Sequence, residues 1–344
     1  MLQTTKQTPI NSPFNNRTTA EKVMKGVDLT GKTAIVTGGY SGIGLKVTEM
    51  LTNAGAHVIV PARSVDKAMP VIDNLKNAEL GLLDLMDPDA INKFAKGFLA
   101  SGRPLNLLIE SAGVMMPTLK RDQRGNESQL STNFLGHFQL TNALYPALKQ
   151  ANHARIIVMS SRAQSWNGVD FDDPNFNHRK YDAHTAYAQS KAADALFAVA
   201  LDKRAAKDDI HAFAVHPGIV PGTDLSRNVT GNEALKKASA FALNQLEFTH
   251  MINTGNSIKA KLAHEREYDY FKTVSQGAAS TLWAATSPQL ADLGGVFIED
   301  CNISHVEPAD SSSKFGVRPW AVDEKTADRL WQLGEQLTGT KFTI

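Results

Sequence analysis

The chain has 344 residues, 42% hydrophobic and 21% charged, enough to bury the core of one large α/β domain or of two smaller ones. Its 36 basic and 35 acidic residues leave a formal net charge of +1. This balance excludes the strongly basic surface that binds nucleic acid or an anionic membrane, and it favours a small-molecule partner. The single cysteine, Cys301, excludes an internal disulfide and a cysteine-based zinc cluster. The histidines are scattered without metal-ligand spacing, so we expect no metal site. Because the chain has only one cysteine, we expect a reducing, cytoplasmic compartment.

Residues 1–27 are polar, contain Pro9 and Pro13, and have no apolar run. They therefore predict neither a signal peptide nor a membrane anchor. We interpret them as an N-terminal extension that either lies over the surface or stays mobile.

From Leu29 onward, short apolar runs alternate with stretches of helical periodicity. The predicted strands are 33–37, 57–60, 79–83, 105–109, 156–159, 212–215 and 296–298. The predicted helices are 42–54, 66–76, 87–99, 127–149, 184–207, 276–286 and 323–337. Alternating strands and helices are typical of a parallel sheet covered on both faces. We predict an α/β, Rossmann-type, doubly wound parallel sheet of about seven strands.

The alternation stops between Thr223 and about Lys272, where a helix is predicted at 233–248. Its apolar face covers either the protein's own core or a ligand. The predicted organisation is a single Rossmann-fold domain over 28–314 with this insertion at about 225–272. Residues 315–344 carry a C-terminal helix that docks on the body.

A glycine-rich turn joins the first strand to the first helix. The apolar, β-branched run Thr33–Thr37 breaks at Gly38, and helical spacing begins after Gly44. Glycines at such a turn let backbone N–H groups approach a pyrophosphate, and the helix N-terminus behind them favours an anion. The alternative is that the glycines only serve the turn's conformation. The βαβ context favours a phosphate-binding loop.

Tyr187 and Lys191 are four residues apart in a helical pattern, so they share one face of the helix. Tyrosine, with a reference pKa of about 10, is a poor acid at neutral pH, but a neighbouring ammonium lowers its pKa. The pair then exchanges a proton with a carbonyl or an alcohol. Such pairs also occur by chance on exposed helix faces.

Polar side chains follow the strand at 156–159. Ser160 and Ser161 stand at its carboxyl end, where open parallel sheets bind ligands, although serines also end strands for turn chemistry alone. Asn133 lies inside a predicted helix, where asparagine is unfavourable unless its side chain has a partner or is exposed.

Together these motifs resemble the short-chain dehydrogenase/reductase family. The loop at 37–44 has the form T-G-x-x-x-G-x-G, and Ser161, Tyr187 with Lys191, and the Pro-Gly run at 216–223 follow in the family's order. The resemblance covers about residues 29–225 and extends through 276–299. The wide gap between Ser161 and Tyr187, which carries Asp-Phe-Asp-Asp-Pro at 170–174, is similar to the branch that contains retinol dehydrogenases and WW-domain oxidoreductases.

The resemblance implies four catalytic residues. Tyr187 is expected to be the general acid/base, and Lys191 to lower its pKa and bind the nicotinamide ribose. Ser161 is expected to hold the substrate oxygen, and Asn133 to support a water relay from Lys191. The residues implied to contact the coenzyme are Gly38, Tyr40, Ser41, Gly42, Ile43, Gly44, Arg63, Asp84, Leu85, Ser111, Ala112, Gly113, Tyr187, Lys191, Pro217, Gly218, Val220 and Thr223.

Two positions depart from the family's pattern. Glu110-Ser111-Ala112-Gly113 stands where the family usually has Asn-Asn-Ala-Gly, and the sequence does not show how the carboxylate at Glu110 is satisfied. The Pro-Gly run is one residue longer before Thr223, which puts the contact of Thr223 with the coenzyme in question.

NADP(H) is expected to be preferred over NAD(H). An NAD site has an acidic residue at the end of the second strand, about twenty residues after the fingerprint. Here that place reads Val60-Pro61-Ala62-Arg63-Ser64, with no acid before Asp66. Arg63 is suited to bind a 2′-phosphate, although a solvated strand-end charge is the alternative.

The predicted function is hydride transfer between a nicotinamide and a carbonyl or alcohol of a small apolar molecule, with residues 225–272 as a helical lid. A homo-oligomer is possible. A nucleotide-sugar epimerase or dehydratase uses a similar fold, but its loop is usually T-G-x-x-G-x-x-G. A non-catalytic coenzyme-binding regulator would not need Ser161, Tyr187 and Lys191 together. A serine hydrolase would need a G-x-S-x-G elbow, which is absent.

Overall fold

The computed structural model describes residues 6–221, 223, 225, 244–263, 267, 269–342 and 344. Eight strands form one sheet in the order β3-β2-β1-β4-β5-β6-β7-β8. They are β1 (Thr33–Thr37), β2 (His57–Ala62), β3 (Ala78–Leu82), β4 (Leu107–Glu110), β5 (Ala154–Met159), β6 (Ile210–His216), β7 (Val296–Glu299) and β8 (Asn302–Ile303). The first seven are mutually parallel, and β8 pairs antiparallel with β7.

The prediction of a doubly wound parallel sheet is confirmed, with one strand more than the seven expected. The extra strand has two residues and follows a turn in which Asp300 and Cys301 both have positive φ, 51° and 57°. Two residues are too few to produce a period-2 pattern, so β8 left no signal in the sequence.

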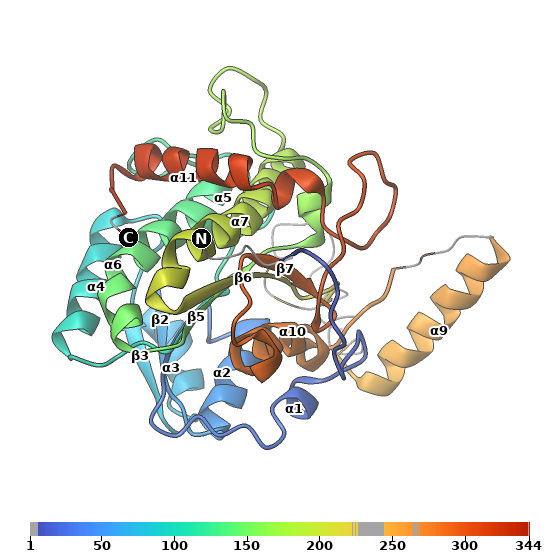
Figure 1. The fold of residues 1–344 in the computed structure, drawn as a ribbon, viewed down its shortest axis with the longest axis horizontal. Helices are drawn as coiled ribbons and strands as arrows, with labels where there is room; N and C mark the ends of the chain where they lie inside the picture. The colour runs from blue at the N-terminus through green and yellow to red at the C-terminus, as the bar shows by residue number, and fades with distance from the viewer. Residues whose placement is uncertain are drawn as a thin grey trace.

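Helices cover both faces of the sheet (Figure 1). The first face carries α4 (Pro88–Ala100), α6 (Gly136–Gln150) and α7 (Ala183–Ala205), with α11 (Glu324–Thr338) packed on α7. The second face carries α1 (Ala20–Val23), α2 (Gly42–Asn53) and α10 (Val274–Thr286), and α3 (Val65–Ile72) lies beside β3. Each face has its own apolar core, separated by the sheet. Burial of both faces explains why the strands read as continuous apolar runs.

The described part of the N-terminal segment lies over the surface of the fold. Ala20 and Val23 are buried against the second face. Gln7 exchanges hydrogen bonds with the main chain of Phe297 in β7 and donates another to the Ser304 carbonyl. The short helix α1 was not predicted because four residues carry too little periodicity.

The helix predicted at 127–149 is interrupted near its start. It consists of α5 (Ser128–Leu130), a π-helical turn (Ser131–Leu135) that contains Asn133, and α6. Such π-turns are rare and frequently occur at functional sites. The buried Asn133 therefore lies at a local break in the helix rather than in a regular α-helical turn.

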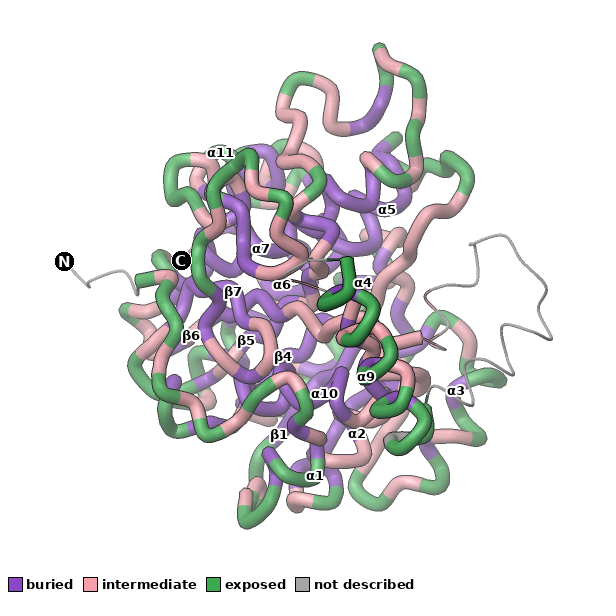
Figure 2. Tube along the Cα trace, turned by 90° about the vertical axis from the view of Figure 1, so that its right-hand side faces the viewer, coloured by how far each residue is buried: buried purple, intermediate pink, exposed green. Residues whose placement is uncertain are grey.

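The insertion contains α9 (Leu246–Leu262), whose outer side is largely exposed in the side view (Figure 2). The helix predicted at 233–248 lies outside the described residues except for its last five positions. Within the described part of the chain, no helix is long and apolar enough to cross a membrane.

Candidate active site

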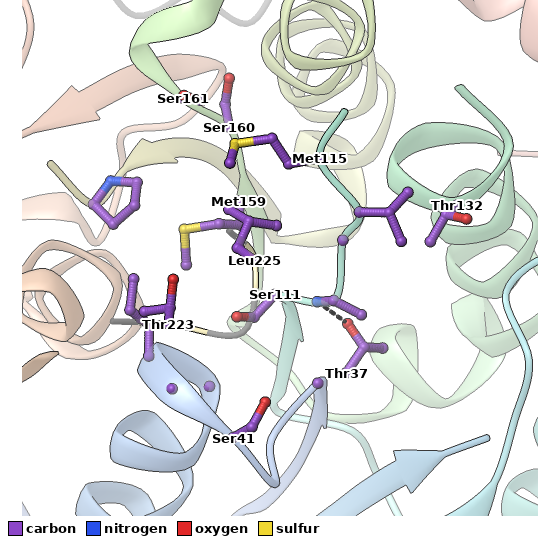
Figure 3. A pocket seen from close by; sticks show the side chains of 18 of the residues that line it. Thr37, Ser41, Ser111, Met115, Thr132, Met159, Ser160, Ser161, Thr223 and Leu225 are labelled. Atoms are coloured by element: carbon purple, nitrogen blue, oxygen red, sulfur yellow. Dashed lines mark hydrogen bonds between the residues drawn. The ribbon is translucent and has the colours of Figure 1, made fainter. Parts of the chain in front are cut away.

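A cavity of about 580 Å³ opens at the carboxyl ends of the central strands (Figure 3). This is where open α/β sheets bind ligands, and the volume falls in the range of small-molecule and cofactor sites. All eighteen residues that the sequence implied for coenzyme contact line it, as does Ser161. They come from segments up to about 185 residues apart, so the fold brings the predicted site together.

The glycine turn has the backbone geometry that its sequence predicts. Gly38 and Gly42 have φ of 67° and 53°, which favour glycine, and a Cβ on Gly44 would overlap the Gly38 carbonyl. Ser41 is the N-cap of α2, yet its side chain makes no capping hydrogen bond. The helix N-terminus therefore faces the cavity uncapped, with its positive end available to an anion. These features fit the pyrophosphate of a dinucleotide.

Tyr187, Ser161 and Lys191 form the polar floor of the cavity. All three side chains line the cavity, and Lys191 Nζ lies 5.8 Å from the centroid of the Tyr187 ring. Burial raises the pKa of Tyr187 above its usual 10, while the Lys191 ammonium and the Ser161 hydroxyl oppose that rise. The expected lowering by Lys191 is thus present, but in this environment burial outweighs it.

Lys191 is fixed by two acceptors. Its Nζ donates to the Met159 carbonyl at the end of β5 and to Asp194 Oδ2, each at 2.8 Å. The Asp194 carboxylate and the Tyr187 hydroxyl raise the pKa of Lys191 against the effect of its burial, so the ammonium stays charged. Ser160, the other strand-end serine, donates to the Lys191 carbonyl at 2.7 Å and so anchors α7 to the sheet.

Asn133 lies behind the cavity rather than in its wall. Its amide accepts from the Val114 N–H at 2.8 Å and donates to the Val114 carbonyl and the Ser190 hydroxyl. The π-turn therefore braces the loop after β4 against α7. Its backbone carbonyl is bonded to His137 Nδ1 at 2.8 Å.

His137 links this turn to the glycine loop. Burial lowers the pKa of His137 to about 4, so the ring is neutral at pH 7. Because Nδ1 must donate to the Asn133 carbonyl, Nε2 accepts from the Thr37 hydroxyl 3.0 Å away. Thr37 in turn accepts from the Ala112 N–H at 3.0 Å, the bond drawn in Figure 3. This chain of bonds aligns β1 with the loop after β4.

Lys272 packs against the Pro-Gly run and is hydrogen-bonded to it. Gly218 has φ of 89°, and a Cβ there would meet the stem of Lys272 at 2.6 Å. The Lys272 ammonium is 2.6 Å from Asp300 Oδ1, and the Lys272 N–H donates to the Ile219 carbonyl. Thr223 lines the cavity despite the extra residue before it.

Arg63, the residue expected to bind a 2′-phosphate, lies among the residues of the cavity wall. It follows β2, is exposed, lines the cavity and forms no ion pair with the described residues. Asp66 lies in the first turn of α3 and is not among the described residues that line the cavity.

One part of the cavity is lined by apolar residues that the sequence analysis did not name. Its lining includes Met115, Met159, Trp166, Ile219 and Leu225. Figure 3 shows Met115, Met159 and Leu225 gathered in one part of the cavity near Ser160. Sequence position could have indicated two of these residues, because Met115 lies two residues after Gly113 and Met159 directly precedes the strand-end serines.

The chain was compared with known proteins. The family model described as short chain dehydrogenase matches residues 32–234. A probable oxidoreductase of Streptomyces antibioticus is 38% identical over 315 residues, which cover 90% of this chain and 98% of that protein. Retinol dehydrogenase 12 of Homo sapiens is 31% identical over 322 residues, 92% of this chain and 89% of the relative.

Among solved structures, an uncharacterized protein from Mycobacterium paratuberculosis superposes with a TM-score of 0.68 at 28% identity, covering 95% of this chain and 99% of the other. The family match spans more than half of the chain, and the relatives align over nearly their whole length. The glycine loop, the serine, and the Tyr187–Lys191 pair occur in the order typical of that family. The chain therefore belongs to the short-chain dehydrogenase/reductase family of oxidoreductases, which use a nicotinamide coenzyme.

Proposed function

We propose that this protein is an NADP(H)-dependent oxidoreductase acting on a carbonyl, or on the corresponding alcohol, of an apolar small molecule. The observation that carries the proposal is the convergence of Tyr187, Ser161 and the Lys191 ammonium on the wall of one cavity that the glycine loop also lines. A proton donor, an oxygen-binding hydroxyl and a phosphate-binding loop are the groups that carbonyl reduction requires.

Tyr187 gives its proton to the carbonyl oxygen in reduction and takes the hydroxyl proton in oxidation. Ser161 donates a hydrogen bond to the same oxygen and so orients the substrate. NADPH supplies the hydride when it is bound. Lys191 stabilises the phenolate that forms as the proton leaves, and it directs its remaining N–H toward the nicotinamide ribose.

The coenzyme's phosphates are assigned to two parts of the cavity. The uncapped N-terminus of α2 receives the pyrophosphate, and Arg63 receives the 2′-phosphate through its planar guanidinium. Asp84 and Leu85 lie beside the adenine, and the Pro217–Gly218 backbone borders the carboxamide. Asn133 supports a water relay from Lys191, since its amide joins the loop after β4 to Ser190 in the helix that carries Lys191.

The substrate is assigned to the apolar end of the cavity. Met115, Met159 and Leu225 bury apolar groups without offering a charge to bind a polar head group. Methionine adapts its shape to irregular ligands. The lid predicted at about 225–272 lies partly outside the described residues, and its first residue, Leu225, lines the cavity.

The test is incubation of the purified protein with NADPH and a panel of apolar ketones and aldehydes, followed by loss of the coenzyme's absorbance. Turnover with NADPH above that with NADH supports the proposal. Binding of both coenzymes without turnover of any carbonyl or alcohol in the panel contradicts it.

A further inference from the structure

A buried ion pair lies directly beneath the proposed catalytic residues. Asp194 follows Lys191 by three residues on α7, with Oδ2 2.8 Å from Nζ, and the two side chains are 1% and 5% exposed. Charges this deep in a protein are stabilised only when they are paired and hydrogen-bonded. Nothing in the family motifs pointed to Asp194.

The geometry limits what Lys191 can do. An ammonium has three N–H groups, and the Met159 carbonyl and Asp194 accept two of them. One N–H therefore remains for the cavity, and its direction is set by the two acceptors behind it. Asp194 therefore helps to fix the position of Lys191 Nζ and supplies its counter-charge.

The other titratable groups coupled to this pair come from neighbouring elements. Glu110 at the end of β4 interacts with Asp194, and burial, with a smaller effect from the Asp194 charge, raises the pKa of Glu110 to about 8. His137 on α6 interacts with Lys191 and is neutral, as described above. At pH 7 the carboxylate of Asp194 is therefore the negative charge that balances Lys191 among these described groups.

We propose that Asp194 is a positioning residue whose carboxylate aims the Lys191 ammonium and keeps both Lys191 and Tyr187 protonated into the alkaline range. A negative charge favours the protonated form of each neighbour, whichever of the two loses its proton first. The proposal rests on the roles of Tyr187 and Lys191 given above.

The first test is the pH profile of carbonyl reduction by the full chain, with NADPH and a carbonyl compound that the unmutated protein reduces. Asp194→Asn keeps a hydrogen-bond acceptor but removes the charge. The alkaline limb of kcat should move to lower pH by about one unit or more, the size expected for a charge in direct contact. The profile is measured in the Glu110→Gln background, with Glu110→Gln alone as the matched reference, because Glu110 has a pKa of about 8 and would itself titrate across this limb. An alkaline limb of Glu110→Gln/Asp194→Asn that coincides with that of Glu110→Gln would overturn the proposal.

The second test does not depend on activity. Urea unfolding is measured from pH 8 to pH 10 for Glu110→Gln and for Glu110→Gln/Asp194→Asn, so that Glu110 does not titrate in either protein. Without its counter-ion the buried ammonium releases its proton at lower pH in the folded state and regains it on unfolding. The midpoint of the double variant should therefore rise relative to the single variant as pH increases. A constant difference between the midpoints overturns the proposal.

Folding failure is also informative. If Asp194→Asn is insoluble, Lys191→Met/Asp194→Asn removes both charges. Recovery of soluble protein supports the pairing, whereas continued insolubility contradicts it. Suppose that Tyr187→Phe is inactive, the alkaline limb does not move and the midpoint difference stays constant. The proposed role of Asp194 is then rejected, and the proposed function stands. A fully active Tyr187→Phe variant would reject the proposed function while the unfolding series still reports on Asp194.

Discussion

Thr141 donates a hydrogen bond to Glu110 across the core of the protein, with 2.6 Å between Oγ1 and Oε1. This bond joins α6 to the end of β4 and answers how the unexpected carboxyl is accommodated. The second oxygen, Oε2, is buried and has no hydrogen-bond partner among the described residues. Burial raises the pKa of Glu110 to about 8, the Thr141 bond opposes that rise, and Asp194 adds to it. Glu110 is therefore a neutral acid at pH 7.

Glu110→Gln should make the protein's stability less dependent on pH. The pKa of Glu110 is about 8 when folded and 4.5 as its ordinary value. A raised folded pKa contributes stability that is fully present below pH 4.5 and is lost as the pH rises through 8. Each pKa unit corresponds to about 1.4 kcal/mol, so a loss of a few kcal/mol is expected for the unmutated protein and not for the variant.

Urea unfolding at pH 5, 7 and 9 checks this expectation. The two proteins should be similar at pH 5 and diverge in favour of Glu110→Gln at pH 9. Parallel stability curves over this range would show that Glu110 does not titrate within it. Thr141→Val, which leaves the carboxyl without its donor, should destabilise the protein at every pH.

Arg63→Ala should weaken NADPH binding and leave NADH binding nearly unchanged. A hydrogen bond to a charged group contributes roughly 1.5–3 kcal/mol, so the loss should be about 10- to 150-fold in affinity. Titration of coenzyme fluorescence measures both constants. Lys67→Ala, an exposed cation on α3 outside the cavity lining, is the control. Equal kcat/KM for the two coenzymes in the unmutated protein would refute the preference.

Met115→Gln should raise KM for an apolar carbonyl substrate much more than KM for NADPH. The side chain lines the apolar part of the cavity. A glutamine amide there would lose its hydrogen bonds to water when an apolar substrate binds, and the substrate offers no hydrogen bond in return. Steady-state kinetics with each ligand varied in turn gives the comparison. Met69→Gln, at a methionine on α3 that is 38% exposed, is the matched control. A proportional change in both KM values would place Met115 outside the substrate's end.

The predictable parts of this protein are those encoded by local patterns. Gly38 and Gly42 could be assigned because positive φ at a strand-to-helix turn requires glycine, and Tyr187 with Lys191 because four residues bring side chains together on a helix. The parallel sheet followed from apolar runs alternating with helical stretches.

The unpredicted parts depend on contacts between distant segments. At the π-turn, the Asn133 amide bonds to Val114 and Ser190, 19 and 57 residues away. Gln7 reaches a strand 290 residues later. Asp194 lies on the same helix as Lys191, but its spacing does not show that it is buried. Its burial, which strengthens its interaction with Lys191, depends on how the core packs around the helix. No spacing rule within one segment reports such contacts.

Tyr187→Phe should lower turnover by about 10²–10⁴-fold, the usual contribution of a general acid or base, and leave NADPH affinity nearly unchanged. The variant removes one hydroxyl of the cavity wall and keeps the ring that packs with Ala163 and Ala188. Pre-steady-state reduction with NADPH in excess separates the chemical step from coenzyme release. Tyr145→Phe is the matched control, because it removes another tyrosine hydroxyl, which donates to Asp208 and lies outside the cavity lining. Activity within a few-fold of the unmutated protein in Tyr187→Phe would mean that the proton comes from another group. A large loss in Tyr145→Phe would mean that removing any buried hydroxyl disturbs the fold, and only a loss confined to Tyr187 assigns the proton transfer to it.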